Sequence, residues 1–383
     1  RGDFGIAAVI LLTLQIVETL TDMSADKLII QADDGASQPV VGTAQSFQLI
    51  RGIATAAIIL AAAYPLAAFY RVPEAGVAFM AVALAPLMKG LINLDMRREQ
   101  RTLNNAPYLS VEVLPQVIAL AATPLALWVA PSYAAVVIIA VVQAGSALLV
   151  ASFTARKPIH FCWDADVARR MLAFSWPIWL SAIPLIAVHQ GDRILIGRLI
   201  GMEAVAGYSA AFLITMVPGL VVAKVGHALL LPLLAEAKGN RNVFAARTRL
   251  MLTAAGILAF CYFAAFALIG GPLLSLVFGS AYSGLHFVVM LLAAMWAMRM
   301  VQAIPGIALM ALGQTRALLS AGIIRALGLI PAYIAITLGY GLEGVAVAAV
   351  AAECASLAYI TWIVARWHRD AGHSRAPAAD AAV

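Results

Sequence analysis

The segment from Leu172 to Gly201 constrains the fold of this chain more than any other stretch. It is about thirty residues long and mostly apolar, which lets one helix cross a hydrocarbon layer of about 30 Å. Pro177 and Pro184 interrupt it, and its second half carries the polar residues His189, Gln190, Asp192 and Arg193. Such groups are costly inside a membrane, so we expect them to face a cavity or a partner helix.

The composition extends this prediction to the whole chain. Of its 383 residues, 63% are hydrophobic and 11% are charged, and the mean hydropathy is +0.94. Soluble domains are about a quarter charged, and barrel strands show short alternating patterns that are missing here. We therefore predict an all-α polytopic membrane protein. Cys162, Cys261 and Cys354 lack the spacing of a metal site or a disulfide framework, so no metal or cofactor is expected.

Eleven apolar segments are candidate membrane spans: 4–29, 43–69, 73–94, 106–130, 132–155, 171–200, 203–224, 250–271, 283–311, 317–338 and 342–365. Two connections between them, 156–170 and 225–249, are long and polar. This pattern predicts a first bundle at 1–155, a cytoplasmic linker at 156–170, a second bundle at 171–366 and a cytoplasmic tail at 367–383.

Lysine and arginine residues set the expected orientation, because they collect in cytoplasmic loops. Alternate loops and the tail hold Arg97, Arg98, Arg101, Arg156, Lys157, Arg169, Arg170, Lys238, Arg241, Arg247, Arg249, Arg316, Arg366, Arg369 and Arg375. The opposite loops hold only Arg1 and Arg71. The first set and the C-terminus are therefore predicted to be cytoplasmic, which also accounts for the net charge of +6.

A weak internal repeat indicates two related halves. The segment DFGIAAVILLTLQIV resembles AVAGYSAAFLITMVP, so that Gly5 corresponds to Gly207, and Pro65 corresponds to Pro272 in a second pair of segments. Span 171–200 then begins the second half. Its counterpart would precede Arg1, so we expect that a first helix, the twelfth in total, is missing from this sequence.

Short motifs support this assignment by their order along the chain. They are Asp3-Phe4-Gly5, Thr21-Asp22, Arg51-Gly52, Pro65 with Phe69-Tyr70, Asp192-Arg193 with Gly197, Gly201 and Gly207-Tyr208, Phe278-Gly279 with Tyr282, and Ala311-Leu312-Gly313. With them the chain resembles, over essentially its whole length, the polysaccharide flippases of the multidrug/oligosaccharidyl-lipid/polysaccharide exporter superfamily. We expect the chain to depart from that family in lacking the first helix.

This resemblance implies two helical bundles around a central cavity. It also implies transport of a lipid-linked oligosaccharide, a precursor of polysaccharide such as lipopolysaccharide, across the bacterial plasma (inner) membrane by alternating access. The implied partners are this lipid, membrane lipid, a proton or sodium ion, and glycan-assembly proteins. No nucleic acid partner and no enzymatic activity are expected.

Acidic residues recur every four positions in the first span, at Glu18, Asp22 and Asp26, with Gln15 just before them. Four residues advance a helix by about 400°, so these side chains are predicted to share one face. We assign them to ion coupling, with Glu18 the deepest in the membrane. The alternative for Asp22 and Asp26 is simple hydration at the cytoplasmic end of the helix.

Five basic residues lie within predicted spans: Arg51, Lys89, Arg193, Arg299 and Arg325. Because guanidinium groups match phosphate oxygens, these residues are candidates for binding the pyrophosphate of a lipid-linked sugar. Arg299 is the strongest candidate, since it lies near the middle of its span. For Arg51, Lys89 and Arg325, snorkelling to the cytoplasmic surface is the alternative.

His189 and Asp192 are three residues apart and could pair on one helix face. We assign them to a gate or to a contact between the bundles, and a purely structural contact is the alternative.

Two other functions compete with the flippase prediction. A membrane-embedded glycan polymerase or ligase would need sizeable outer loops, whereas the outer connections here are short. A cation-coupled multidrug antiporter of the same superfamily would suit the acidic residues of the first span. The intramembrane arginines instead favour an anionic lipid.

Overall fold

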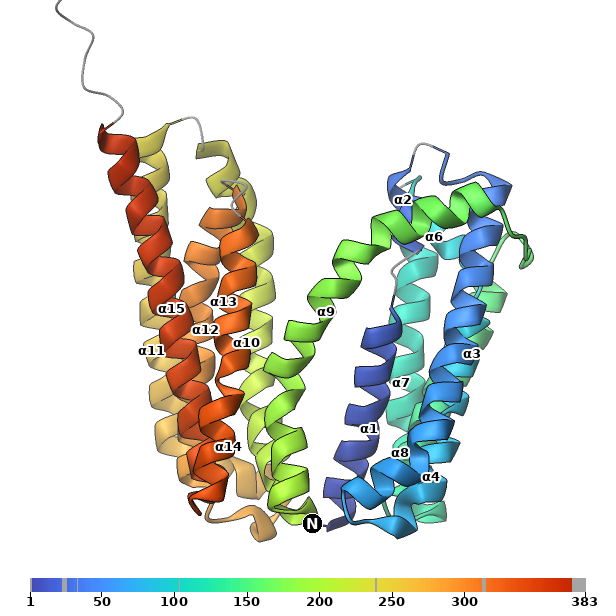
Figure 1. Ribbon diagram of the computed structural model, residues 1–383, viewed down its shortest axis with the longest axis horizontal. Coiled ribbons are helices and arrows are strands. Elements are labelled where there is room, and N and C mark those ends of the chain that lie inside the picture. The colour runs from blue at the N-terminus through green and yellow to red at the C-terminus, as the bar shows by residue number, and fades with distance from the viewer. Residues whose placement is uncertain are drawn as a thin grey trace, which may run out of the picture. The chain divides into compact units, whose positions relative to one another are not determined.

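The computed structural model describes residues 2–22, 26–32, 34–102, 104–237, 240–311 and 315–373, and every regular element in these residues is a helix. The predicted all-α class is thus confirmed. The chain forms two compact units. Figure 1 colours the chain by residue number, from blue at the N-terminus to red at the C-terminus. Unit 1 comprises 1–186 with 201–206, and unit 2 comprises 187–200 with 207–383. The boundary falls inside helix α9 (Ala165–Leu199), which therefore contributes to both units.

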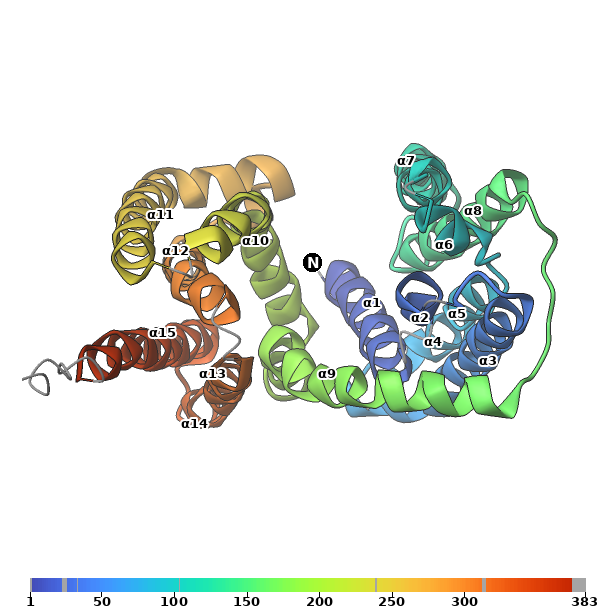
Figure 2. The same ribbon diagram turned by 90° about the horizontal axis from the view of Figure 1, so that it is seen from above.

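Unit 1 contains the helices of the first half of the chain and the first part of α9. These are α1 (Gly2–Thr21), α2 (Asp26–Gln31), α3 (Gln38–Phe69), η1 (Pro73–Ala75), α4 (Gly76–Ala81), α5 (Leu84–Gly90), α6 (Asp95–Gln100), α7 (Ala106–Val129) and α8 (Ala134–Thr154). Helices α7 and α8 lie side by side, and α5 packs between α3 and α8 (Figure 2).

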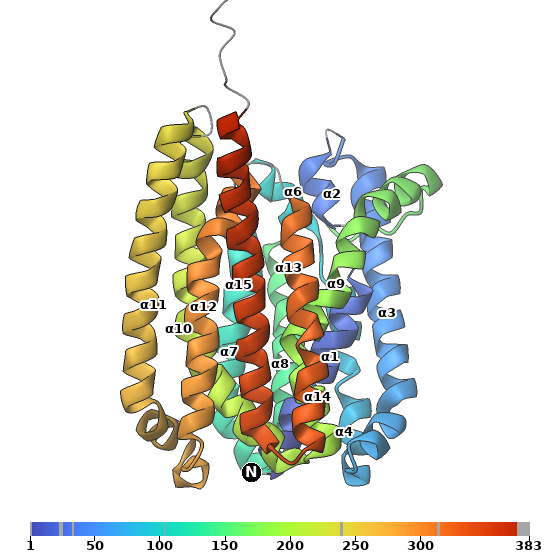
Figure 3. The ribbon, with the colours of Figure 1, turned by 60° about the vertical axis from the view of Figure 1, so that its left-hand side comes forward.

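Unit 2 contains the last part of α9, helix α10 from Gly207 onward, and all later helices. These are α10 (Met202–Ala237), α11 (Arg241–Phe278), η2 (Ser280–Tyr282), α12 (His286–Ala311), α13 (Thr315–Leu327), α14 (Leu329–Thr337) and α15 (Gly341–His373). Helices α13 and α14 follow each other end to end along α15 (Figure 3). Helix α12 packs against both α11 and α15, so it lies at the centre of its unit.

The outer surface of the helices supports a membrane location. Within the described residues, nine helices are long and apolar enough to cross a bilayer. Large apolar side chains point outward along them, for example Trp128 at 82% exposure, Leu268 at 78% and Leu276 at 82%. Exposed apolar surface of this extent would aggregate in water, and lipid is the solvent that suits it.

Two predicted spans are broken by proline. Span 73–94 is divided into α4 and α5 at Val82–Ala83, and span 317–338 is divided into α13 and α14 at Gly328. A proline ring clashes with the carbonyl group four residues earlier. For Pro86 that residue is Val82, and for Pro331 it is Leu327, so each break lies within one turn before a proline. Pro65 in α3 and Pro305 in α12, by contrast, leave their helices continuous.

Side chains of α3 stabilise the broken segment that contains α5. The Gln45 amide donates to the Ile92 carbonyl oxygen at 2.9 Å, and the Gln48 amide donates to the Lys89 carbonyl oxygen at 2.8 Å. These bonds supply side-chain donors to carbonyl groups at the end of α5 and just after it, where helical bonding stops. Gly52 lets the two backbones approach, since a Cβ atom there would lie 2.8 Å from the Gly90 Cα atom.

Two other predicted segments are wrong. Span 4–29 is not one helix, because α1 ends at Thr21 and α2 begins at Asp26. Thr21 and Asp22 are residue types whose side chains bond to nearby backbone and favour helix ends. The predicted polar connection 225–249 is mostly helical, since α10 continues to Ala237 and α11 begins at Arg241.

Some predicted features lie outside the described residues. These are Arg1, Lys238 of the predicted cytoplasmic cluster, Leu312-Gly313 of the last motif, and positions 374–383 of the predicted tail.

Candidate functional site

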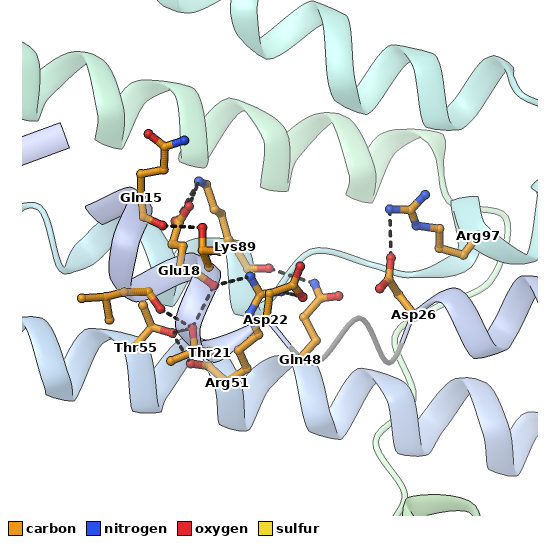
Figure 4. Close-up of polar contacts among 12 residues, drawn as sticks. Gln15, Glu18, Thr21, Asp22, Asp26, Gln48, Arg51, Thr55, Lys89 and Arg97 are labelled. Carbon is orange, nitrogen blue, oxygen red and sulfur yellow. Dashed lines mark hydrogen bonds and ion pairs between the residues drawn. The ribbon is translucent and has the colours of Figure 1, made fainter. Parts of the chain in front are cut away.

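The first group of charged side chains lies in unit 1, where α1, α3 and α5 meet (Figure 4). The Lys89 ammonium group donates to both carboxylate oxygens of Glu18, at 2.8 and 3.0 Å. The two side chains are 43% and 22% exposed, respectively. The residue predicted to couple an ion and a residue predicted to bind the substrate are therefore bonded to each other.

A second ion pair lies just after the end of α1. The Arg51 guanidinium group contacts the Asp22 carboxylate at 3.0 Å, and it also donates to the Glu18 carbonyl oxygen at 3.3 Å. The hydroxyl groups of Thr21 and Thr55 bond to each other at 2.8 Å beside this pair. As Figure 4 shows, these contacts tie the end of α1 to the middle of α3.

Asp26 does not extend the same acidic face, because it begins the separate helix α2. Its carboxylate pairs with Arg97 of α6 at 2.9 Å. The prediction of one continuous acidic stripe over Glu18, Asp22 and Asp26 is therefore wrong. In unit 1, each of these three carboxylates has one cationic partner, so the group is electrically balanced.

The second group lies in unit 2 and centres on Glu353 of α15, a residue that the sequence reasoning did not identify. The Arg299 Nε atom donates to the Glu353 Oε2 atom at 3.0 Å, and an Arg325 terminal nitrogen lies 3.7 Å from the Oε1 atom. Glu353 is 1% exposed. The structure thus brings together Arg299 and Arg325 on α12 and α13 around one buried carboxylate.

Arg193 and Asp192 extend this group from α9. The Tyr208 hydroxyl group donates to the Asp192 carboxylate at 2.6 Å, within unit 2. Arg193 donates to the Gln190 side-chain oxygen at 3.0 Å, and its guanidinium group stacks 4.3 Å from the centre of the Phe212 ring. His189 makes an interaction as well, so neither of the two predicted gate residues is isolated.

A pocket inside unit 2 connects these residues. Its walls include Arg299, Arg325, Glu353 and Asp192, and also Phe212, on which Arg193 stacks. Among the described side chains of this group, three guanidinium groups accompany two carboxylates. The pocket wall itself holds two of these guanidinium groups and both carboxylates, and the third guanidinium group, that of Arg193, stacks on the wall residue Phe212. The largely apolar surroundings strengthen the electrostatic interactions of all five groups.

One ion pair outside the predicted spans lowers the pKa of its acidic residue. The Arg170 guanidinium group donates to both carboxylate oxygens of Asp34, at 2.8 and 2.9 Å. These hydrogen bonds are the main reason that the pKa of Asp34 lies below its usual value. The pair joins the start of α9 to the α2–α3 connection, both within unit 1.

The sequence relates this chain to known proteins. A model of the polysaccharide biosynthesis protein family matches residues 1–286. The chain belongs to this family. A comparison with curated proteins finds no match.

Solved structures show that this member of the polysaccharide biosynthesis family has the fold of a MOP superfamily transporter, with two bundles as predicted. A multidrug resistance MATE family transporter of the MOP superfamily is 15% identical, with a TM-score of 0.80 over 98% of this chain and 92% of that chain. A MOP superfamily transporter from Pyrococcus furiosus Vc1 is 17% identical, with a TM-score of 0.57 over 94% and 85%. MATE in complex with MaL6 is 16% identical, with a TM-score of 0.59 over 95% and 85%.

Within this family member, the predicted site residues separate into two groups. Lys89 and Arg51 lie in unit 1 with the predicted coupling acids, whereas Arg193, Arg299 and Arg325 lie in unit 2 around Glu353. Glu353 could have been found from the sequence, since it is the single acidic residue in the apolar run from Gly344 to Val364. An acid at such a position requires a partner.

Proposed function

We propose that this protein carries a lipid-linked oligosaccharide, a polysaccharide precursor, across the bacterial plasma membrane by alternating access. The family and the transporter fold support the general class. The observation that carries the proposal is that Arg299 and Arg325 share the single buried carboxylate of Glu353 at the pocket of unit 2. A diphosphate group is the anion that such a pair of guanidinium forks would bind.

The charge distribution favours this cargo over a cationic drug. A cationic drug needs unpaired carboxylates or an aromatic cage. In unit 1, Glu18, Asp22 and Asp26 each hold a cation, and in unit 2 the two arginines Arg299 and Arg325 share the one carboxylate of Glu353. The net charge of this cluster around Glu353 is therefore positive.

The proposal includes ion coupling at Glu18. This carboxylate is held by Lys89, so a proton that binds to Glu18 would release Lys89 and loosen the contact between α1 and α5. Binding of a proton would then bias the packing of unit 1, which is how a titratable group can drive a transport cycle.

Substitution of Arg299 by alanine tests the proposed function. We expect Arg299→Ala to abolish export of surface polysaccharide in cells that depend on this protein, while the amount of protein in the membrane is unchanged. Arg366→Ala is the matched control, because Arg366 stacks on Trp362 as Arg299 stacks on Trp296, but is not part of the pocket wall. Export by the control should be normal.

Dye resistance and polysaccharide chain length, measured in the same cells, distinguish the flippase from the drug antiporter and the polymerase. Loss of resistance to cationic dyes in Arg299→Ala cells, with normal glycan export, would indicate a drug antiporter instead. Polysaccharide of altered chain length at a normal rate of export would indicate a polymerase.

A further inference from the structure

Glu353 is the most deeply buried acidic side chain of unit 2 for which the structure gives contacts. Its residue exposure is 1%, and its two oxygens are unequally engaged. The Oε2 atom accepts a hydrogen bond from Arg299, whereas the Oε1 atom has only the longer contact with Arg325 and no hydrogen bond. A buried carboxylate of this kind depends on its cations, because desolvation makes an unpaired charge costly.

Both arginines keep donors that Glu353 does not use. Arg299 donates through its Nε atom, and in the described part of the chain its terminal nitrogens have no hydrogen-bond partner. The Arg325 Nε atom is buried and also lacks a partner there. Since both residues belong to the pocket wall, an anion in the pocket would meet their guanidinium groups.

The remaining charged groups near the pocket are already engaged. Asp192 of α9 accepts from the Tyr208 hydroxyl group of α10 and from the Arg193 backbone N–H group. Arg193 is bonded to Gln190 and stacked on Phe212. Among the described residues, Glu353 is therefore the carboxylate that holds Arg299 and Arg325, and an incoming phosphate must compete with it.

We infer that Glu353 is an internal competitor of the substrate's diphosphate group. It occupies Arg299 and Arg325 when the pocket is empty, and phosphate oxygens displace it when the lipid binds. When the lipid leaves, Glu353 takes the arginines back and so promotes release. A carrier needs this balance, since an ion that binds too strongly does not leave. The inference rests on the proposed function and makes Glu353 a positioning residue.

Binding of inorganic pyrophosphate to the purified full chain in lipid nanodiscs tests this inference. Glu353→Gln keeps the size of the side chain and removes its charge. We expect it to bind pyrophosphate about ten-fold more tightly than the unsubstituted protein, since one charge-assisted hydrogen bond no longer has to be broken. Glycan export in cells should at the same time become slower, because release is impaired. A residue with a merely structural role would weaken binding when replaced.

Two further variants complete the experiment. Glu343→Gln makes the same chemical change on the same helix, at an exposed position outside the pocket wall, and should leave pyrophosphate affinity unchanged. Glu353→Asp keeps the charge on a shorter side chain, and should give an intermediate affinity even if Glu353→Gln does not fold.

Equal or weaker pyrophosphate binding by Glu353→Gln and Glu353→Asp would overturn the inference, as would the absence of binding by all the proteins. The proposed function fails separately, through normal glycan export by Arg299→Ala. If both Glu353 substitutions leave the pyrophosphate affinity unchanged while Arg299→Ala abolishes export, the proposed function stands and the inference about Glu353 is wrong.

Discussion

The Glu18–Lys89 ion pair gives the most quantitative prediction about unit 1. Lys89→Met leaves the Glu18 carboxylate without its ammonium partner, and Glu18→Gln leaves the ammonium group without its carboxylate. The double substitution removes both charges. If the pair stabilises the contact between α1 and α5, the double variant will be less destabilised than the sum of the two single variants.

The size of this coupling follows from the geometry. The ammonium nitrogen lies 2.8 and 3.0 Å from the two carboxylate oxygens. Hydrogen bonds between charged groups contribute about 1.5–3 kcal/mol when buried, and exposed ion pairs contribute about 0–1 kcal/mol. Because the side chains are 43% and 22% exposed, an intermediate coupling of about 1–2 kcal/mol is expected. In a unit of this size, each kcal/mol shifts the melting temperature by about 2–4 °C.

Thermal unfolding of the four proteins in detergent, at one fixed scan rate, measures the coupling. Each single variant should melt about 2–8 °C lower than the unsubstituted protein. The matched control is the exposed pair Asp166–Arg169, whose atoms are 3.4 Å apart and whose side chains are 89% and 82% exposed. The cycle of Asp166→Asn and Arg169→Met should give a coupling below about 0.5 kcal/mol. A Glu18–Lys89 coupling as small as that of the control would refute the reasoning.

Two other predictions concern coupling and packing in unit 1. Glu18→Gln should transport at a rate that no longer responds when the proton or sodium gradient is collapsed, and a full response by this variant in a vesicle assay would remove Glu18 from coupling. Gly52→Ala should lower the melting temperature by several degrees, since the new Cβ atom would lie 2.8 Å from backbone atoms of Gly90 and Pro86 and overpacking costs about 1–3 kcal/mol. Gly256→Ala is its control, because a Cβ atom there meets nothing within 4 Å, and a fall in melting temperature as large as that of Gly52→Ala would contradict the packing argument.

Hydropathy alone predicts most of the helices, because a bilayer requires long apolar segments with internally bonded backbone. Hydropathy does not indicate where two of the predicted spans are interrupted, and proline residues do. The breaks at Val82–Ala83 and at Gly328 lie just before Pro86 and Pro331, whose rings clash with the carbonyl group four residues earlier. A reading based only on hydropathy passes over these prolines and draws continuous spans.

The pairing of charges was harder to predict than their presence. Glu18 and Lys89 are 71 positions apart, and Arg299 and Glu353 are 54 positions apart. Residue type and depth identify such groups as costly in a membrane, but partners from different helices depend on the tertiary packing. The sequence therefore predicts that Arg51 and Lys89 are available to a substrate, whereas the structure places each of these two residues beside an acid.

The most direct test of the central claim is movement of a lipid-linked oligosaccharide across a bilayer by the purified protein in liposomes. Accessibility of the glycan to an external hydrolase reports the movement of the lipid. We expect the protein to transfer a polyprenyl-diphosphate oligosaccharide faster than empty liposomes do, and Arg299→Ala to reduce the rate to the level of empty liposomes. A rate equal to that of empty liposomes for the unsubstituted protein, together with transport of a cationic dye, would contradict the account.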